Sequence, residues 1–494
     1  MSALVAGIDI ATADARVSVV DAEGAVVASG AAALATPRRP APGRAEQDAR
    51  SWWPAVCAAL RQATGALGER ARTIVAVTPT ATSGTFVLVG SDGLPIGPAL
   101  LYDDARAATQ AQHAQELGEE RWRACALHIA PSFALAKLAW LAEAGMLTPG
   151  VRAWGAADLV VAGLTGEAPR TDWSHALKTG YDLVRREWPH DVLERLGIPA
   201  ATLPEVAPPG TPAGVVAPAA ARASGLPAGC EVRLGMTDSC TAQLACGASA
   251  RGDFVSVLGT TLVLKGVSAR LVHDPSGVVY SHRHPDGAWL PGGASNTGGE
   301  ALAVRFRGRD LRALDAAAAR RGPAGVLAYP LARAGERFPF LAAQSRGFAV
   351  GRARDEVEEY RAILDGVAFV ERLAYAHLAS LGAPASGTLA TAGAASASVV
   401  WNRIRATVLG RAIVVAANPR SSFGAAVLAA AGSIHGDLAA ATAAMVRTHT
   451  TIEPDAREAA ALAGGYLRFV EELATRGWIA PTLAAAARER ASGA

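Results

Sequence analysis

The chain has 494 residues, of which 51% are apolar and 18% are charged, and its formal net charge is +3. This composition is typical of a well-packed globular protein and excludes a disordered chain, and the length exceeds one ordinary hydrophobic core, so two domains are expected. The small net charge and the lack of a Lys/Arg block argue against a nucleic-acid partner.

The cysteines and the N-terminal residues predict the compartment. Five cysteines are scattered along the chain without a Cys-x-x-Cys spacing, which is typical of a reducing cytoplasm and predicts neither structural zinc nor disulfides. Residues 3–8 are apolar, but no basic segment precedes them and Asp9 follows at once. We therefore expect a cytoplasmic protein without a signal peptide or a membrane anchor.

A hairpin is the first predicted element. Leu4–Ile10 and residues 16–20 have the pattern of strands, and a tight polar loop that includes Asp9 and Thr12 joins them. Asp9 is a candidate anchor for a hydrated magnesium ion, because Mg²⁺ keeps several waters and takes one or two carboxylates together with phosphate oxygens. A turn-forming aspartate after a strand is the alternative interpretation.

Hydroxyl and acidic side chains mark two further loops in the first half. Ser83 lies in a Thr-Ser-Gly-Thr segment between the predicted strands 73–78 and Phe86–Val89; such a segment can bind sugar hydroxyls, although the residues alone favour a simple turn. Asp103 and Asp104 precede a helix and would suit a polyol, but adjacent acids at a helix start are usually caps.

Several helices complete the first half of the chain. The hydrophobic spacing predicts helices over 47–71, 133–145 and 156–164. His175 lies where a loop enters a helix, without a paired acid at catalytic spacing, and we interpret it as structural.

Asp238 is the strongest catalytic candidate. It follows a predicted strand at 231–234 and a flexible Gly235, and it precedes an Ala-rich segment that favours a helix. Its carboxylate would therefore project from a loop at the end of a strand, where a proton acceptor can reach a substrate hydroxyl. A helix-capping aspartate is the alternative.

A second hairpin lies close to this acid along the chain. The strands Phe254–Leu258 and Leu262–Gly266 flank Gly259, Thr260 and Thr261, a turn that can direct backbone N–H groups and hydroxyls at a phosphate. An acid beside a candidate phosphate loop suggests phosphoryl transfer to an alcohol, whereas an ordinary hairpin is the alternative.

The two hairpins share one layout, which we interpret as a weak internal repeat with one copy per domain. We expect the domains to comprise residues 1–246 and 247–494. A hinge near 246–252 would let a cleft close on its ligand.

Glycine-rich turns recur in the second half. Residues 292–299, which include Gly298, are expected to open a helix and to let a nucleotide approach closely. A strand at 388–391, the turn Gly393-Ala394-Ala395, a helix over Val399–Leu409 and a strand at 413–415 form an α/β crossover whose turn could accept an adenine ring. The sequence predicts a packed Ala-rich helix over residues 421–432. It also predicts amphipathic helix over residues 437–494.

In this order, the motifs resemble the FGGY family of carbohydrate kinases over essentially the full length. The resemblance implies an α/β fold of two actin-like (ribonuclease-H-like) domains flanking a catalytic cleft, and ATP-dependent phosphorylation of a sugar or polyol with Mg²⁺. The segments that carry it are 9–16, 102–106, 159–172, 235–247, 259–261, 292–299, Gly393 with Trp401-Asn402, and 423–426.

The resemblance also implies roles for single residues. Asp238 matches the general base, and Asp9 matches the acid at the magnesium and phosphate end. The candidate sugar contacts are Asp9, Ser83, Asp104 and Asp238. The candidate nucleotide contacts are Thr12 and Gly259-Thr260-Thr261 in the phosphate loops, Gly298, and Gly393-Ala394-Ala395 at the adenosine site.

Within this family, the chain is most similar to the D-ribulose kinase group of cyanobacteria and plants. The telling segments include 176–181, 280–282 and 335–339. Xylulokinases usually carry Gly-Gln-x-His-Gly where this chain has Ser83-Gly84. The expected reaction is therefore the conversion of D-ribulose and ATP to D-ribulose 5-phosphate by a monomer or homodimer.

Two alternatives to this reaction remain open. D-xylulose or another ketose or polyol could be the substrate. Ala11, Ala13 and Ala394 stand where the family usually has Gly or Ser, and a Cβ can crowd a ligand where the backbone requires glycine. A sugar-binding regulatory protein that has lost nucleotide binding is thus the second alternative.

Overall fold

The structure is a computed structural model that describes residues 2–492, and the chain forms two compact units. The first unit runs to Gly247 and also contains His282–Gly287 and Asn418–Arg447. The second contains Ala248–Ser281, Ala288–Ala417 and the residues from Thr448 onward. The chain first crosses between the units beside the boundary expected at 246 and 247, but the two later insertions make both units discontinuous.

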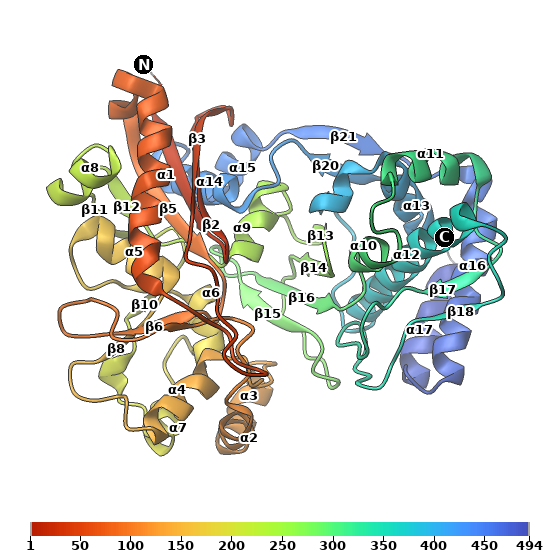
Figure 1. The fold of residues 1–494 in the computed structure, drawn as a ribbon, viewed down its shortest axis with the longest axis horizontal. Coiled ribbons are helices and arrows are strands. Elements are labelled where there is room, and N and C mark those ends of the chain that lie inside the picture. Colours follow the sequence, from red (N-terminus) through yellow and green to blue (C-terminus); the bar gives the residue numbers. More distant parts are fainter. Residues whose placement is uncertain (1, 493–494) are drawn as a thin grey trace. The chain divides into compact units, whose positions relative to one another are not determined.

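The first unit is built on a six-stranded sheet (Figure 1). The central strand β1 is antiparallel to β2 and parallel to β5, which in turn is parallel to β12. Because β1, β5 and β12 run in one direction, their carboxyl ends meet at one edge of the sheet. In spatial order the strands are β11 (Pro212–Val215), β12 (Glu231–Arg233), β5 (Ile74–Ala81), β1 (Leu4–Ile10), β2 (Asp14–Asp21) and β3 (Val26–Ala33).

Strand β1 is buried on both faces, which explains its continuous apolar pattern. Leu4, Ala6 and Ile8 belong to the core formed with α1 and α5, whereas Val5 belongs to the core formed with α14. Gly7 permits the second contact, because a Cβ there would lie 1.9 Å from a carbonyl oxygen of α14. The late helix α14 therefore belongs to the first unit.

Helices surround this sheet, and two small sheets accompany it. A four-stranded sheet joins β4 (Glu46–Gln47), β7 (Ala99–Leu100), β6 (Phe86–Val89) and β8 (Arg152–Gly155), and β9 (Thr171–Asp172) pairs with β10 (Val206–Ala207). The helices of the first unit are α1 (Trp52–Leu67), α2 (Ala108–Leu117), α3 (Glu119–Ala124), α4 (Ala134–Glu143), α5 (Ala156–Thr165), α6 (Trp173–Ala176), α7 (His190–Arg195), α8 (Pro218–Ser224), α9 (Asp238–Ala245), α14 (Ser421–Ser433) and α15 (Leu438–Met445).

The second unit repeats the strand directions of the first. Its strand β13 is antiparallel to β14 and parallel to β19, which is parallel to β20. The repeat predicted from two hairpins thus extends to the parallel strands beside them. In spatial order the seven strands of this sheet are β15 (Tyr280–Arg283, of which Tyr280 and Ser281 belong to this unit), β16 (Trp289–Ser295), β14 (Leu262–Gly266), β13 (Phe254–Leu258), β19 (Leu389–Ala392), β20 (Ile413–Ala416) and β21 (Thr448–Ile452).

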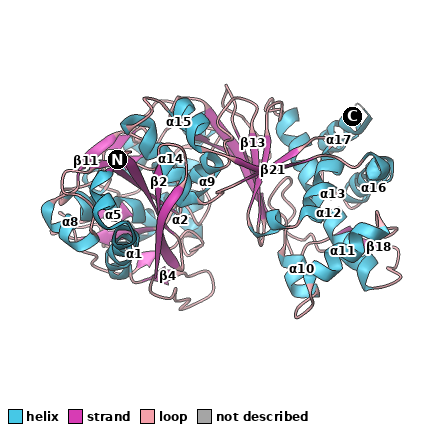
Figure 2. Ribbon diagram, turned by 90° about the horizontal axis from the view of Figure 1, so that it is seen from above, coloured by secondary structure: helices cyan, strands magenta, loops and turns pink. Residues whose placement is uncertain are grey.

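In both units the strands lie among helices (Figure 2). A buried ion pair between Arg405 of α13 and Glu371 of α12 fastens the second sheet, because the guanidinium also donates to Ser256 of β13 and Thr391 of β19. The remaining elements are α10 (Glu300–Arg305), α11 (Leu311–Arg321), α12 (Glu356–Ser380), α13 (Val399–Leu409), α16 (Ala456–Thr475), α17 (Pro481–Ser492) and the pair β17 (Leu327–Tyr329) and β18 (Phe348–Val350).

Three predicted elements differ from the structure. The helix expected over 47–71 is shorter, because Glu46–Gln47 pairs with Ala99–Leu100 as a strand. Residues 292–295 lie in β16, and the helix begins only at Glu300. The region 437–494 contains the edge strand β21 as well as helices. Among the described residues no helix is long and apolar enough to cross a membrane, and all five cysteines are buried free thiols.

Candidate active site

Asp9, Ser83 and Asp238 gather at the carboxyl edge of the first sheet. Asp9 is near the end of β1, Ser83 follows β5, and Asp238 follows β12 as the first residue of α9. Since these three strands are parallel, residues far apart in the sequence reach the same edge, as the sequence interpretation requires of an acid site.

Asp9 is a buried carboxyl group with an oxygen that lacks a partner. Asp9 is 6% exposed, and its Oδ1 accepts no hydrogen bond from any described residue. Burial and, less strongly, the carboxylate of Asp238 together raise the pKa of Asp9 to about 7, and the Arg16 guanidinium opposes the shift. The two acids are therefore close enough to influence each other.

Several hydrogen bonds hold Asp238 at the start of α9. The backbone N–H of Ser239 donates to Asp238 Oδ1 at 2.6 Å, and the Ser421 hydroxyl donates to the Asp238 carbonyl oxygen at 3.1 Å. The hydroxyl of Thr80 on β5 donates to the carbonyl oxygen of Met236 at 2.5 Å. Asp238 itself is only half-buried, so its carboxylate remains accessible while its backbone is fixed.

The surroundings of Asp9 fit a magnesium ion. A cation would satisfy the orphaned Oδ1 and relieve the repulsion between the two carboxylates. The described residues contain no cluster of three or more His, Cys, Asp or Glu side chains that could hold a metal ion. Mg²⁺ needs no such cluster, since it commonly takes one or two carboxylates and completes its shell with water and phosphate oxygens.

The loop around Ser83 is fixed from beneath by a buried lysine that sequence analysis did not identify. Lys137 Nζ donates to the carbonyl oxygens of Gly84 at 2.7 Å and Leu101 at 2.8 Å, so it ties the Ser83 loop to the acidic loop at 101–104. Burial lowers the pKa of Lys137 to about 7, although Asp104 opposes the shift. Ser83 Oγ is a buried hydroxyl oxygen that has no hydrogen-bond partner among the described residues.

The two carboxylates of the acidic loop differ in their hydrogen bonds. Asp104 is fully buried, and its oxygens accept hydrogen bonds from the Arg106 guanidinium and from the backbone N–H of Ala45. Asp103 pairs with Arg39 through Oδ2, but its Oδ1 has no partner within residues 2–492. Asp104, the predicted sugar contact, thus has both oxygens engaged by protein groups, whereas Asp103 keeps one oxygen without a partner.

In the second unit, Gly259, Thr260 and Thr261 form the turn of the β13–β14 hairpin and are accessible. Gly298 packs directly on this turn, because a Cβ at Gly298 would lie 2.5 Å from the Thr260 carbonyl oxygen. The backbone N–H groups of Gly299 and Glu300 donate to the carbonyl oxygens of Gly259 and Thr260. The predicted phosphate turn and Gly298 thus form one structural element.

A buried glutamate supports this element from behind. The carboxylate of Glu336 accepts hydrogen bonds from the hydroxyls of Ser295, Thr297 and Tyr329 and from the backbone N–H of Asn296. Residues 295–297 lead straight into Gly298. The sequence singled out this Gly-Glu-Arg-Phe-Pro segment only as part of a resemblance, and the structure gives the glutamate a local role.

The turn at Gly393 lies at the carboxyl end of β19 in the same unit. Gly393 has φ of +90°, and a Cβ there would lie 2.5 Å from the Leu258 carbonyl oxygen, so glycine is required. Ala394 and Ala395 begin a 3₁₀ turn. Among the described residues the non-glycine residues with positive φ are Ala126 and Arg186, so neither these alanines nor Ala11 and Ala13 occupy a backbone conformation that demands glycine.

His175 has an acidic partner, contrary to the sequence interpretation. The Asp172 carboxylate accepts a hydrogen bond from His175 Nδ1, three residues along the chain on the first turn of α6. The i, i+3 spacing on a helical turn was a usable signal that the analysis of catalytic spacing overlooked. The interpretation of His175 as a buried structural residue is otherwise consistent with its 8% exposure.

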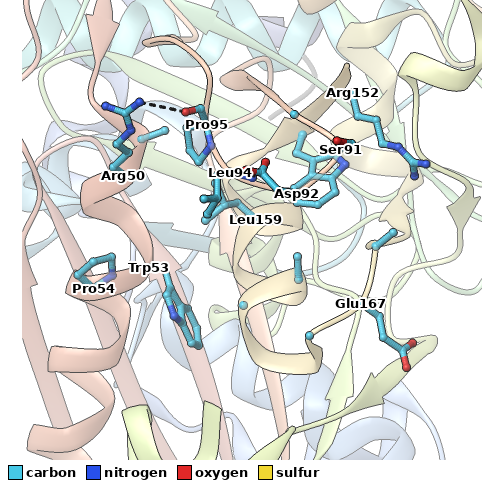
Figure 3. A pocket seen from close by; sticks show the side chains of 18 residues that line it. Arg50, Trp53, Pro54, Ser91, Asp92, Leu94, Pro95, Arg152, Leu159 and Glu167 are labelled. Atoms are coloured by element: carbon cyan, nitrogen blue, oxygen red, sulfur yellow. Dashed lines mark hydrogen bonds between the residues drawn. The ribbon is translucent and has the colours of Figure 1, made fainter. Parts of the chain in front are cut away.

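A separate cavity of about 570 Å³ in the first unit contains none of the predicted site residues. Figure 3 shows Trp53 and Pro54 on one side and Arg152 and Glu167 on another, with the Arg50 guanidinium directed at the carbonyl oxygen of Pro95 at 3.3 Å. Its walls are mainly apolar, and it lacks the paired carboxylates that distinguish the edge of the sheet.

Comparisons with known proteins identify the family of the chain. The N-terminal domain of the FGGY family of carbohydrate kinases matches residues 4–245, and the C-terminal domain matches residues 255–433. A xylulose kinase of Streptomyces rubiginosus is 34% identical over 458 residues, which cover 89% of this chain and 90% of that protein. A glycerol kinase of Gloeobacter violaceus is 29% identical over 433 residues, which cover 83% of this chain and 84% of that protein.

A solved structure extends the likeness to the whole fold. The xylulose kinase of Rhodospirillum rubrum matches with a TM-score of 0.85 and 27% identity, over 96% of this chain and 98% of that chain. These relatives bear the names of xylulose and glycerol kinases, so they do not single out the D-ribulose kinase group that the sequence motifs favour. The chain, with its two-domain α/β fold, belongs to the FGGY family of carbohydrate kinases.

Proposed function

We propose that the protein transfers the terminal phosphoryl group of ATP to the terminal hydroxyl of a ketopentose. The observation that carries the proposal is the pair of carboxylates Asp9 and Asp238 at one sheet edge, beside an unpartnered serine hydroxyl, Ser83. One acid with an orphaned oxygen suits a cation, and the half-buried acid suits proton transfer, so the pair meets both requirements of phosphoryl transfer to an alcohol.

In this reaction Asp238 accepts the proton of the sugar hydroxyl while the oxygen of that hydroxyl forms a bond to the γ-phosphorus. The bond between that phosphorus and the oxygen bridging to the β-phosphate breaks, and ADP leaves with the bond electrons. Asp9 would hold the metal, and Mg²⁺ would supply neutralisation of the charge that develops on the phosphate oxygens. Backbone N–H groups and hydroxyls of Gly259-Thr260-Thr261 bind the phosphates of the nucleotide.

The choice of sugar rests on two sets of observations that favour different ketopentoses. The sequence motifs favour D-ribulose and its conversion to D-ribulose 5-phosphate, which is our first candidate. The name of the Streptomyces relative favours D-xylulose, which differs from D-ribulose in configuration at C3. We propose that Ser83 and Asp103, rather than Asp104, contact the sugar hydroxyls, because both keep an unpartnered oxygen.

A coupled assay of ADP release over D-ribulose, D-xylulose, ribitol and glycerol tests this proposal. We expect one ketopentose to give the highest kcat/KM, with glycerol at least about a hundredfold lower, because a site that hydrogen-bonds each hydroxyl discriminates against substrates that lack them. A preference for glycerol would contradict the choice of substrate class, and turnover of none of these sugars would contradict the choice of sugar kinase.

The backbone conformation weakens one argument for the alternative, a regulatory protein that does not bind nucleotide. Ala11, Ala13 and Ala394 prompted it, and all three have negative φ, so glycine is not required there for conformational reasons. Calorimetry with Mg-ATP separates the two functions. The kinase binds Mg-ATP in the absence of sugar, whereas sugar binding without detectable nucleotide binding would favour the regulatory protein.

A further inference from the structure

We propose that Asp172, Ser174 and His175 form a buried positioning network that fixes the loop carrying Asp238. This inference rests on the proposed role of Asp238 as the general base, since it assigns the residues that hold this base in place. The network lies in the first unit, on β9 and the short helix α6.

An unbroken chain of hydrogen bonds joins the network to the loop. The backbone N–H of Thr237 donates to Ser174 Oγ at 2.9 Å, and the Ser174 hydroxyl donates to Asp172 Oδ1 at 2.5 Å. The serine hydroxyl has a single hydrogen, which Asp172 accepts, so its lone pairs remain directed at Thr237. Thr237 is the N-cap of α9 and immediately precedes Asp238.

His175 locks the other side of the same carboxylate. Its Nδ1 faces Asp172 Oδ2, and its Nε2 faces the carbonyl oxygen of Ala81 at 3.2 Å. Both partners are acceptors, so both ring nitrogens carry hydrogen and the imidazole is protonated. Ala81 ends β5 and forms a parallel bridge with Thr237, so the imidazolium joins the carboxylate to the strand on which the catalytic loop rests.

The electrostatics of this cluster agree with its geometry. Burial alone would lower the pKa of His175, but the Asp172 carboxylate and its hydrogen bond outweigh burial, with a smaller contribution from the buried Asp158, and raise the pKa to about 9. Asp172 on β9 and Asp158 on α5 are the charged groups that face the ring. The positive charge of His175 in contact with Asp172 keeps the Asp172 carboxylate in one orientation.

Burial assigns these residues a positioning role. Asp172 is 2% exposed, Ser174 is 0% exposed and His175 is 8% exposed, and, unlike Ser83 and Asp9, they have all their polar side-chain atoms hydrogen-bonded to protein groups, which leaves none for a substrate. A misplacement of a catalytic group by about 1 Å can cost on the order of a hundredfold in rate. The network therefore matters to turnover through the position of Asp238.

Hydrogen exchange tests the network without requiring any activity. Ser174→Ala removes the acceptor of the Thr237 N–H, and the matched control Ser224→Ala removes an equally buried serine that accepts the N–H of Leu226 at 3.2 Å. We expect amide exchange across 235–241 to rise at least about tenfold in Ser174→Ala but not in Ser224→Ala, because only the first variant frees this loop. Equal exchange in both variants overturns the proposal.

Kinetics with the preferred sugar provide the second measurement. We expect Ser174→Ala to lower kcat by about ten- to a hundredfold with the sugar KM within about threefold, since the base is displaced while sugar contacts remain. Ser224→Ala should leave kcat unchanged. Faster loop exchange in Ser174→Ala without a fall in kcat overturns the positioning role.

A second variant and the wild type keep the outcomes distinct. Asp172→Asn should reproduce the exchange and kcat changes of Ser174→Ala, and it replaces that variant if Ser174→Ala does not fold. A wild-type protein that phosphorylates no sugar contradicts the proposed function, and the exchange measurement then decides alone whether the network holds the loop.

Discussion

At the end of β1, the carboxyl group of Asp9 is buried and lies near a second carboxylate, that of Asp238. Both features make the ionised form of Asp9 unfavourable in the folded protein. Burial raises the pKa of Asp9 to about 7, so the folded protein holds this proton more tightly than the unfolded chain, in which a carboxyl group titrates near 4. The unfolding free energy therefore falls as the pH rises from about 4 to about 7 and changes no further above that range.

Asp9→Asn should accordingly make the metal-free protein more stable at pH 8. The gain should be on the order of 4 kcal/mol at most, from about 1.4 kcal/mol per pKa unit, and should become small near pH 4, where the wild-type carboxyl group is protonated in the folded state and about half protonated in the unfolded chain. Thermal unfolding in EDTA from pH 4 to pH 8.5 measures the difference. A stability difference that does not vary with pH would contradict the assignment of a raised pKa to Asp9.

At the scale of single residues, the sequence identifies the types of side chain at the site, but it does not show which of them already have hydrogen-bond partners in the fold. The pair Asp103 and Asp104 was identified as a candidate ligand site, but the commitment of Asp104 depends on the backbone of Ala45, 59 residues away. The partner of His175 was within reach of sequence reasoning, whereas its second contact, the carbonyl of Ala81, lies 94 residues away and follows only from the fold.

At the scale of elements, the proposed phosphate turn of β13–β14 is held by a neighbouring segment rather than by its own residues. Gly298 packs on the turn, and Glu336 fixes the residues before Gly298 through buried hydrogen bonds. A buried donor that loses its acceptor costs about 1–3 kcal/mol. Removal of this one carboxylate should therefore loosen the whole support.

Glu336→Ala should weaken Mg-ATP binding at least about tenfold while sugar affinity stays within about twofold, because the proposed sugar contacts are residues of the first unit. Glu358→Ala is the matched control, since Glu358 is also buried in the second unit and accepts the backbone N–H groups of Arg354 and Gly325. Calorimetry with each ligand measures both affinities. Equal losses of nucleotide affinity in the two variants would remove the special role of Glu336.

Short elements with strong local signals agree with prediction, and elements fixed by distant contacts do not. Strands β1, β6, β13 and β14 have the predicted bounds, because apolar runs between turn residues define them locally. The placement of α14 in the first unit depends on its packing against Gly7, more than 400 residues earlier in the chain. The edge strand β21 pairs only with β20 among the described strands, and its own sequence gives little alternation.

At the scale of the whole molecule, one pattern of strands serves both units. In each, a hairpin is followed by parallel strands whose carboxyl ends share an edge, and each edge gathers candidate residues from three separate segments: Asp9, Ser83 and Asp238 in the first unit, and the turns at 259–261, 298 and 393–395 in the second. The repeat explains why the candidate residues of each unit follow the carboxyl ends of its parallel strands.

The kinetics of Asp238→Asn test the central claim most directly. The variant keeps the size of the side chain and removes the proton acceptor, so kcat on the preferred sugar should fall by about 10²–10⁴-fold, with Mg-ATP affinity and thermal unfolding close to those of the wild type. A variant that folds normally and retains turnover within tenfold of the wild type would contradict the assignment of Asp238 as the general base.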